Sequence, residues 1–130
     1  MKTIKQTYQI KAPVEKVWQA LVDPKIIEKW SGAGAKMDAN VGTKFELWGG
    51  DIHGTNTQVV NPPSGGKKLV QDWYGGDWDE PSKATFTLED KNGETEITLV
   101  NENVPDEQVD DIEDGWTRYY LGEIKKLLEN

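Results

Sequence analysis

Residues 106–128, DEQVDDIEDGWTRYYLGEIKKLL, contain the clearest periodic signal in this sequence of 130 residues. At about 100° per residue, apolar side chains return to one face, which predicts a single helix from Glu107 to about Leu128. Asp106, directly after Pro105, is the expected N-cap. The apolar face is made of Val109, Ile112, Trp116, Tyr120, Ile124 and Leu127. Because such a face must be buried, we expect it to lie against the concave side of a sheet.

Gly115 stands inside this predicted helix. Glycine in a helix interior costs about 1 kcal/mol relative to alanine, so its presence needs a local reason. We expect another backbone or a large aromatic ring to come close to the helix at Gly115, and the neighbouring Trp116 is the first candidate for that ring.

The chain before this helix predicts an antiparallel sheet. Residues 3–11 alternate polar and apolar side chains, which is typical of a half-buried strand. From about Lys36 to Val104, alternating stretches separated by turn residues predict a meander, in which Asp-Lys-Asn-Gly at 90–93 forms a tight hairpin turn. Residues 62–66 and 75–81, rich in glycine and proline, are expected to be irregular loops.

Two short helices are predicted between the first strand and the meander. Pro13 suits the first helical position of one helix, and Asp23-Pro24 repeats the start signal for the second. The run Ser-Gly-Ala-Gly at 31–34 ends it. The elements together predict an α+β fold of the helix-grip type, in which a curved antiparallel sheet wraps around a long C-terminal helix.

Length and composition narrow the class of protein. The 130 residues fit one domain, residues 1–130, and a mean hydropathy of -0.73 disfavours a membrane span. The first residues lack the apolar block of a secretory signal, so we expect a cytoplasmic protein. A net charge of -8 repels phosphate backbones, so nucleic acid is not an expected partner. The absence of cysteine excludes disulfides and thiolate zinc sites.

Candidate catalytic and metal-ligating residues are scarce. His53 is the single histidine, and it alternates with Asp51, Thr55 and Thr57 in a row that suits a solvated strand face. A histidine-based metal cluster is therefore impossible, and a Ser-His-acid arrangement has only one possible centre. We predict no catalytic residue, no metal site and no cofactor.

Particular motifs resemble a known family. The run 12–18, APVEKVW, followed by Asp23-Pro24 and Trp30, looks like the start of START-like (SRPBCC) domains. Gly54, the strand from Leu69 to Trp73, Trp78, the runs 90–96 and 104–105, and GWTRYY at 115–120 resemble the C-terminal domain of the activator of the heat-shock protein 90 ATPase. The resemblance covers nearly the whole chain.

This resemblance implies a cavity between the sheet and the C-terminal helix, and a chaperone as partner. The co-chaperones of the family carry a separate N-terminal domain, which this sequence does not show, so we expect a stand-alone single-domain homologue. Asn56 stands where the family leads us to expect an apolar strand residue, which argues against a purely apolar cavity.

The predicted cavity wall combines aromatic residues with two polar ones. Core packing is the competing interpretation for every ring, because aromatic side chains ordinarily fill cores. For Glu123, burial without a partner would cost several kcal/mol, so it either points outward or meets a polar group inside. The candidates are Phe45, Asn56, Trp73, Phe86, Trp116, Tyr119, Tyr120 and Glu123.

A second candidate surface is the acidic start of the C-terminal helix. Its members are Asp106, Glu107, Asp110, Asp111 and Asp114, a run with no compensating base. The plain interpretation is a solvated helix face. The functional interpretation is that one-signed charge steers a basic protein partner.

We therefore predict a non-enzymatic binding module, co-chaperone-like or hydrophobic-ligand-binding. The alternative is an enzyme of the cyclase or hydrolase type that acts on an apolar substrate in the cavity, which requires polar groups such as Asn56, Glu123, Tyr119 and Tyr120 to converge there. A fully packed centre would leave surface-mediated protein binding. The chain is expected to be a monomer or a homodimer.

Overall fold

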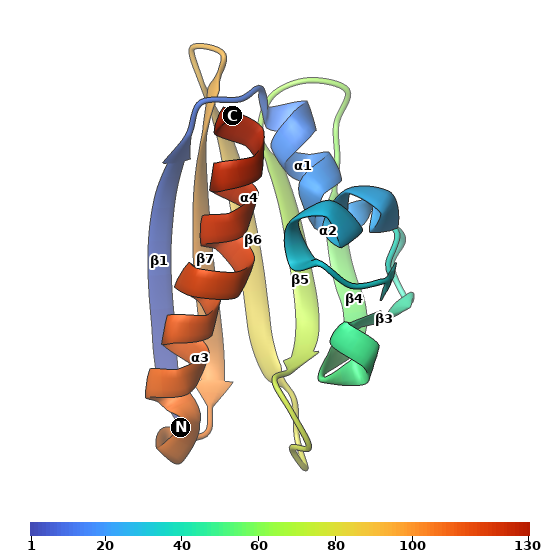
Figure 1. Ribbon diagram of the computed structural model, residues 1–130, viewed down its shortest axis with the longest axis vertical. Coiled ribbons are helices and arrows are strands. Elements are labelled where there is room, and N and C mark those ends of the chain that lie inside the picture. The colour runs from blue at the N-terminus through green and yellow to red at the C-terminus, as the bar shows by residue number, and fades with distance from the viewer.

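Seven antiparallel strands form one curved sheet in the computed structural model, which describes residues 1–130 (Figure 1). Their order across the sheet is β1-β7-β6-β5-β4-β3-β2. The strands are β1 (Lys2–Ile10), β2 (Ala35–Lys36), β3 (Lys44–Leu47), β4 (Ile52–Val60), β5 (Lys67–Tyr74), β6 (Ser82–Lys91) and β7 (Glu94–Val104). All the helices cover the same face of this sheet (Figure 1). The predicted α+β helix-grip architecture is confirmed.

The two short helices follow their predicted signals, except that Pro13 is the N-cap of the first helix and not its first helical residue. They are α1 (Val14–Val22) and α2 (Pro24–Ser31). The Asp23 side chain accepts a hydrogen bond from the Lys25 amide, 2.9 Å away, and Pro24 occupies the first turn of α2. Gly32 ends α2 in the left-handed region with φ of 78°, a conformation that glycine adopts without steric cost.

The hairpin between β6 and β7 also follows its sequence. The Asp90 carboxylate accepts a hydrogen bond from the Gly93 amide at 3.0 Å. Asn92 and Gly93 both have positive φ, 58° and 88°, as a tight two-residue turn requires. The register that this turn sets places Phe86 opposite Leu99 and Leu88 opposite Ile97, so that both pairs face the core.

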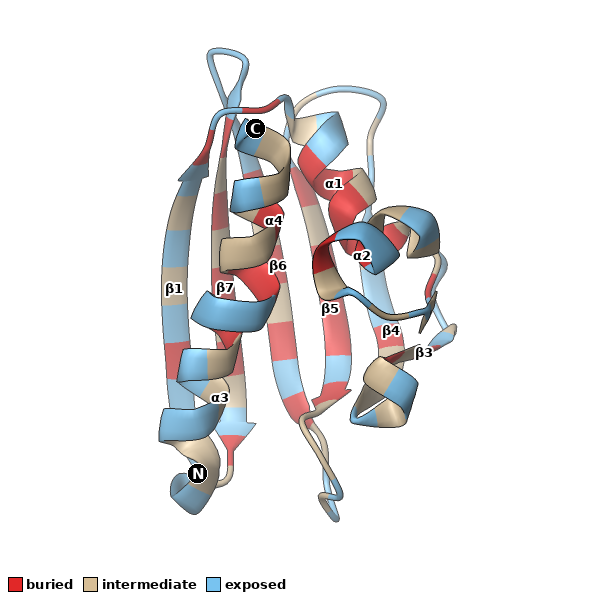
Figure 2. Ribbon diagram, viewed as in Figure 1, coloured by how far each residue is buried: buried red, intermediate tan, exposed pale blue.

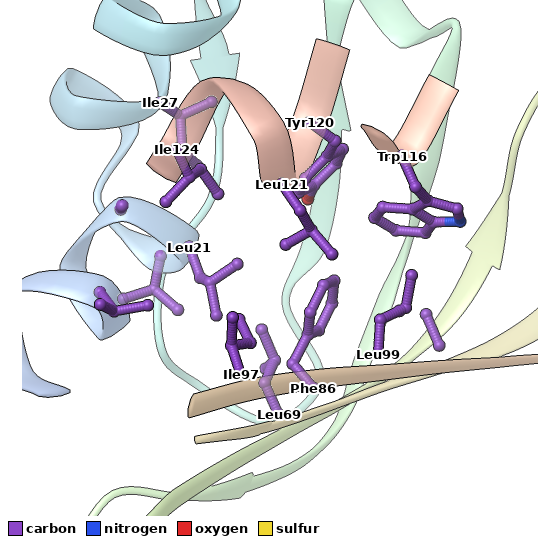
Figure 3. Close-up of a cluster of buried hydrophobic side chains, with 14 of the residues drawn as sticks. Leu21, Ile27, Leu69, Phe86, Ile97, Leu99, Trp116, Tyr120, Leu121 and Ile124 are labelled. Carbon is purple, nitrogen blue, oxygen red and sulfur yellow. The ribbon is translucent and has the colours of Figure 1, made fainter. Parts of the chain in front are cut away.

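One hydrophobic core of 25 buried residues lies between the sheet and the helices. Figure 2 shows buried segments, coloured red, both on the strands of the sheet and on the helices that cover it. In Figure 3, Trp116, Tyr120 and Leu121 point from the C-terminal helix toward Phe86 and Leu99 of the sheet. The helix therefore closes the concave side of the sheet, as its apolar stripe predicts.

The C-terminal segment is helical throughout but is not one regular α-helix. It comprises a 3-10 turn η2 (Asp106–Gln108), α3 (Val109–Gly115), a π-helical turn η3 (Trp116–Tyr120) and α4 (Leu121–Glu129). The π-turn adds a residue to the helical repeat, so Tyr120 and Leu121 are both buried although they are adjacent in sequence. The 3.6-residue periodicity therefore predicted Tyr120 and missed Leu121.

Asp106 is not the N-cap that the sequence predicts. The regular helix begins only at Val109, and the carboxylate of Asp106 instead lies 2.6 Å from the Met1 ammonium. A hydrogen bond from that ammonium holds the pKa of Asp106 below its usual range. The aspartate is therefore used to fasten the N-terminus to the start of the helix, although the pair is exposed and contributes little stability.

The glycine that the helix requires is Gly122, and the expectation for Gly115 is wrong. A Cβ added at Gly115 meets no atom within 4 Å. A Cβ added at Gly122 would lie 1.9 Å from the carbonyl oxygen of Thr117, because the π-turn brings that oxygen beside the Gly122 Cα. Only a residue without a side chain fits there.

Lys67 at the start of β5 is buried although it is charged. Its ammonium donates to the Asn61 side-chain oxygen and to the Pro62 carbonyl, each 2.7 Å away, and lies 3.1 Å from a carboxylate oxygen of Glu15 on α1. The side chain itself is only 1% exposed. These contacts tie the loop at residues 61–66 to the first helix.

We expect Lys67→Met to lower the free energy of unfolding by about 1–3 kcal/mol, because two charge-assisted hydrogen bonds disappear and leave their acceptors unpaired. Urea unfolding followed by circular dichroism measures the loss. Lys68→Met, one residue further along and half-buried without an ion pair, is the matched control and should change stability by less than about 0.5 kcal/mol. Equal unfolding midpoints for the two variants would contradict the role given to Lys67.

Candidate functional site

A groove of about 320 Å³ opens between the C-terminal helix, the start of β4 and the end of β5. Its residues come from η1 (Trp48–Gly50), the start of β4, the end of β5, α3 and the π-turn. They are Trp48, Asp51, Ile52, Trp73, Gly75, Asp111, Ile112, Gly115, Trp116, Tyr119 and Tyr120. Seven of these eleven residues are hydrophobic, so the groove is an apolar recess at the surface.

Stacked aromatic rings form the floor of the groove. The rings of Trp73 and Trp116 stack with centroids 4.7 Å apart and an interplanar angle of 28°, and the Tyr120 ring lies 4.6 Å from Trp116. Trp48 approaches Tyr120 edge-on at 6.2 Å. Ring pairs at such distances stabilise one another beyond the apolar area they bury. The floor is therefore pre-formed.

A buried chain of hydrogen bonds holds Trp116 in place. Its indole Nε1 donates to the Asn101 side-chain oxygen at 3.1 Å, and the Asn101 amide donates to the Ser82 hydroxyl at 2.9 Å. Ser82 in turn donates to the Trp73 carbonyl at 2.7 Å. This chain connects the π-turn to β7, β6 and β5, so the helix and the sheet position the two stacked indoles together.

The mouth of the groove carries negative charge and one exposed ring. Asp51 and Asp111 are exposed and lie on different elements, one before β4 and the other on α3. The Tyr119 side chain is 61% exposed beside them. No lysine, arginine or histidine is among the lining residues. The recess thus combines an apolar floor with an acidic rim.

Glycine keeps the groove open at two places. A Cβ on Gly75 would lie 2.7 Å from the Trp73 ring and 2.8 Å from the Ile112 side chain, so a larger residue would displace both walls. Gly115 lines the groove without any neighbour at the position of a Cβ. The site therefore has room for a side chain at 115 but not at 75.

The ionisable groups of the lining are two aspartates and two tyrosines. Burial raises the pKa of the Tyr120 hydroxyl above its ordinary value, so this group stays protonated. The lining contains no serine, cysteine, lysine or histidine that could form a nucleophile–base pair. Nor does the structure bring three histidine, aspartate or glutamate side chains together in a group that could hold a metal ion.

The structure separates the predicted cavity residues into two groups. Trp73, Trp116, Tyr119 and Tyr120 line the groove together. Phe86 lies behind them, 5.7 Å from Trp116, as part of the core. The others do not line the groove: Phe45 is buried beside a second, shallower hollow at β3 and β4, and Glu123 is half-exposed on α4.

Asn56 is fully buried but does not line the groove. Its amide donates to the carbonyls of Asp38 and Asn40, at 2.9 and 3.3 Å, and its side-chain oxygen accepts a bond from Gln71 at 3.0 Å. A polar residue on the inner face of β4 is tolerated because each of its groups has a partner. Asn56 therefore fastens the loop before β3 and leaves the groove floor aromatic.

Two carboxylates of the acidic run are paired with positive charges, contrary to the expectation from sequence. Asp106 pairs with the N-terminus, and Asp114 lies 2.9 Å from Arg118, one helical turn later. Glu107 and Asp110 are exposed outside the groove. Of the five predicted partner-binding acids, Asp111 alone lines it.

His53 is half-buried within the shallower hollow. Its ring stacks on Tyr74 with centroids 4.7 Å apart, and its Nδ1 lies 3.0 Å from the Gly50 carbonyl oxygen. These contacts give the single histidine a packing role beside the turn that ends β3.

Two groove residues, Asp51 and Gly75, had no functional signal in the sequence, and Trp48 carried only the general signal of an aromatic ring, which either packs in a core or lines a pocket. Trp48 and Gly49 both have positive φ, 51° and 68°, and this left-handed turn swings Trp48 toward the helix. The repeated glycines were the available signal for a turn, but their distance from the C-terminal helix depends on the curvature of the whole sheet.

Nearly the whole chain matches one known family of domains. The family model described as "Activator of Hsp90 ATPase homolog 1-like protein" matches residues 11–129. The human activator of 90 kDa heat shock protein ATPase homolog 1 is 31% identical over 126 residues, which are 95% of this chain and 36% of that protein. The chain thus spans about a third of the length of the curated relatives it matches.

Solved structures give the same result for the fold. An HSP90 activator from Plasmodium falciparum aligns with a TM-score of 0.83 and 28% identity, over 98% of this chain and 96% of that one. The Aha1 dimer from Colwellia psychrerythraea aligns with a TM-score of 0.77 and 21% identity, over 99% of this chain and 97% of that one, a likeness of fold. None of the helices here is both long and apolar enough to cross a membrane.

Proposed function

The chain belongs to the family of activator of Hsp90 ATPase homolog 1-like proteins, and from this membership we propose that it is a non-enzymatic, co-chaperone-like module that docks on an Hsp90-type chaperone through the groove beside its C-terminal helix. The observation that carries the proposal is the pre-formed aromatic floor. Trp73, Trp116 and Tyr120 lie together at the bottom of a recess that is open to solvent.

The physical driving force is the removal of apolar surface from water. This surface belongs to the half-buried Trp48, Ile52 and Ile112 and the exposed Tyr119, because the rings of the floor are themselves only 2% exposed. Each square ångström of apolar surface buried contributes roughly 25 cal/mol before the costs of association are subtracted. Binding energy at protein interfaces is concentrated in a few aromatic and arginine residues that fill recesses. Because the floor is already ordered by the Trp116–Asn101–Ser82 chain, docking requires little rearrangement of this chain.

We propose docking on the chaperone for this chain and not the whole activity of its longer relatives. The curated relatives are named as activators of the chaperone's ATPase, and the chain corresponds to about a third of their length. A groove on this domain supports recognition of a chaperone, and we limit the proposal to that recognition and do not extend it to stimulation of the ATPase, for which the longer relatives are named.

Filling the groove should prevent docking without unfolding the domain. We expect Gly115→Leu to weaken binding to a purified Hsp90-type chaperone of the same organism at least about tenfold, since leucine favours a helix and its side chain would occupy the recess. Tyr119→Ala should weaken binding about three- to tenfold by removing the exposed ring. Biolayer interferometry on the immobilised chain measures both.

Val41→Ala is the matched control for loss of an exposed apolar side chain, since Val41 is 64% exposed and lies outside the groove. It should bind the chaperone like the unaltered chain. The proposed function is wrong if Gly115→Leu keeps full affinity while remaining folded, or if the unaltered chain does not bind the chaperone.

A further inference from the structure

We propose that the groove accepts a basic segment of its protein partner, in which one apolar side chain enters the recess and is flanked by lysine or arginine. The inference rests on the proposed function, because it names the partner chemistry that the same groove would recognise. It is carried by the combination of an aromatic floor with two unpaired carboxylates at the rim.

The two carboxylates are placed to receive cations. Asp51 and Asp111 belong to opposite walls of the groove, and both are exposed. Neither takes part in any of the ion pairs of the protein, whereas Asp106 and Asp114 on the same helical segment are already paired. An incoming lysine or arginine would therefore meet two carboxylates that have no competing base.

The size of the recess favours a side-chain anchor over a whole small molecule. Its volume of about 320 Å³ lies at the lower end of the range in which drug-sized ligands are enclosed, and one flank is open to solvent. One large apolar side chain can enter such a space while the rest of the segment stays on the rim. The exposed ring of Tyr119 offers a face on which a guanidinium can stack.

The net charge of the whole chain also favours a basic partner. A net charge of -8 attracts basic segments from a distance and repels acidic ones. Such steering raises association rates and weakens as salt screens the charges over about 8–10 Å. Apolar anchoring in the recess would supply the part of the affinity that salt does not remove.

The test uses fluorescein-labelled peptides and fluorescence polarisation with the full chain. A peptide of pattern Lys-Lys-Leu-Lys-Lys should bind, its Glu-Glu-Leu-Glu-Glu counterpart should not, and Lys-Lys-Gly-Lys-Lys should bind at least about fivefold more weakly because it lacks the anchor. Asp111→Asn should weaken binding of the first peptide about two- to fivefold. Glu113→Gln, which removes the same charge from the same helix outside the groove, should leave it unchanged.

Two results would overturn the inference directly: equal binding of the acidic and basic peptides, or equal effects of Asp111→Asn and Glu113→Gln on binding of the basic peptide. It would also be overturned if dodecylamine bound more tightly than the basic peptide, because the occupant would then be a small amphiphile. If the basic peptide fails while the chaperone binds and Gly115→Leu abolishes that binding, the inference falls and the proposed function stands. If the peptide binds as expected and the chaperone does not, the docking proposal falls and the chemistry of the groove stands.

Discussion

Trp116→Ala is expected to lower the free energy of unfolding by about 3–5 kcal/mol, which is the usual cost of deleting a large aromatic side chain from a core. Trp116 is 2% exposed, stacks on Trp73 and donates to Asn101. Its removal creates a cavity under the helix and leaves the Asn101 oxygen buried without its donor. Since a domain of this size is stable by only about 5–15 kcal/mol, thermal and urea unfolding should both show the loss clearly.

Trp116→Phe separates the contribution of aromatic packing from that of the hydrogen bond to Asn101. Phenylalanine keeps most of the stacking but cannot donate to Asn101, so the expected loss is about 1–3 kcal/mol. A loss for Trp116→Ala no larger than that for a surface substitution such as Lys91→Ala would contradict the view that this tryptophan joins helix and sheet. Because Trp116→Ala weakens the fold itself, Gly115→Leu and Tyr119→Ala are the better variants for tests of binding.

Gly122→Ala is the second substitution with a large expected effect, a loss of about 2–4 kcal/mol of unfolding free energy. The methyl group would lie 1.9 Å from the Thr117 carbonyl oxygen, so the π-turn would have to open or shift register. Either change moves Trp116 and Tyr120, which form part of the groove floor. Urea unfolding measures the stability, and near-ultraviolet circular dichroism reports the rearranged aromatic residues.

Gly115→Ala is the matched control, because it makes the same change one and a half to two turns earlier in the same helical segment. No atom lies within 4 Å of the added Cβ, so the substitution should raise stability by up to about 1 kcal/mol through helix propensity. The two alanines are therefore expected to have effects of opposite sign. Similar losses at both positions would show that the π-turn does not depend on Gly122.

The elements of the fold were predictable because each is specified by local chemistry. The alternation in residues 3–11 corresponds to β1, with Ile4 and Ile10 buried, and Asp23-Pro24 and Asp90 act in the turns that their side chains suggest. The π-turn was not predictable from the hydrophobic period, since a single inserted residue shifts the stripe only from Leu121 onward. Gly122 was its sequence signal, but a clash with a carbonyl five residues earlier is visible only in three dimensions.

The candidate site was predictable on the helical side and, on the sheet, at Trp73 alone. The apolar stripe of the C-terminal helix indicated Trp116 and Tyr120, because the apolar face of that helix can only pack against the sheet. Asn56 was misplaced, since a buried amide with satisfied hydrogen bonds and an amide in a pocket look the same in sequence. Trp48 and Asp51 reach the groove through a left-handed turn, whose position relative to the helix is set by long-range strand pairing.

Hydrogen–deuterium exchange of the chain, alone and with the purified Hsp90-type chaperone, tests most directly whether the groove is the docking surface. We predict slower exchange in residues 48–52 and 109–120 on binding, the two segments that form most of the groove walls, with exchange in α1 and in the β6–β7 hairpin unchanged. Protection of α1 or that hairpin, with residues 109–120 unaffected, would place the partner on another face and contradict the account.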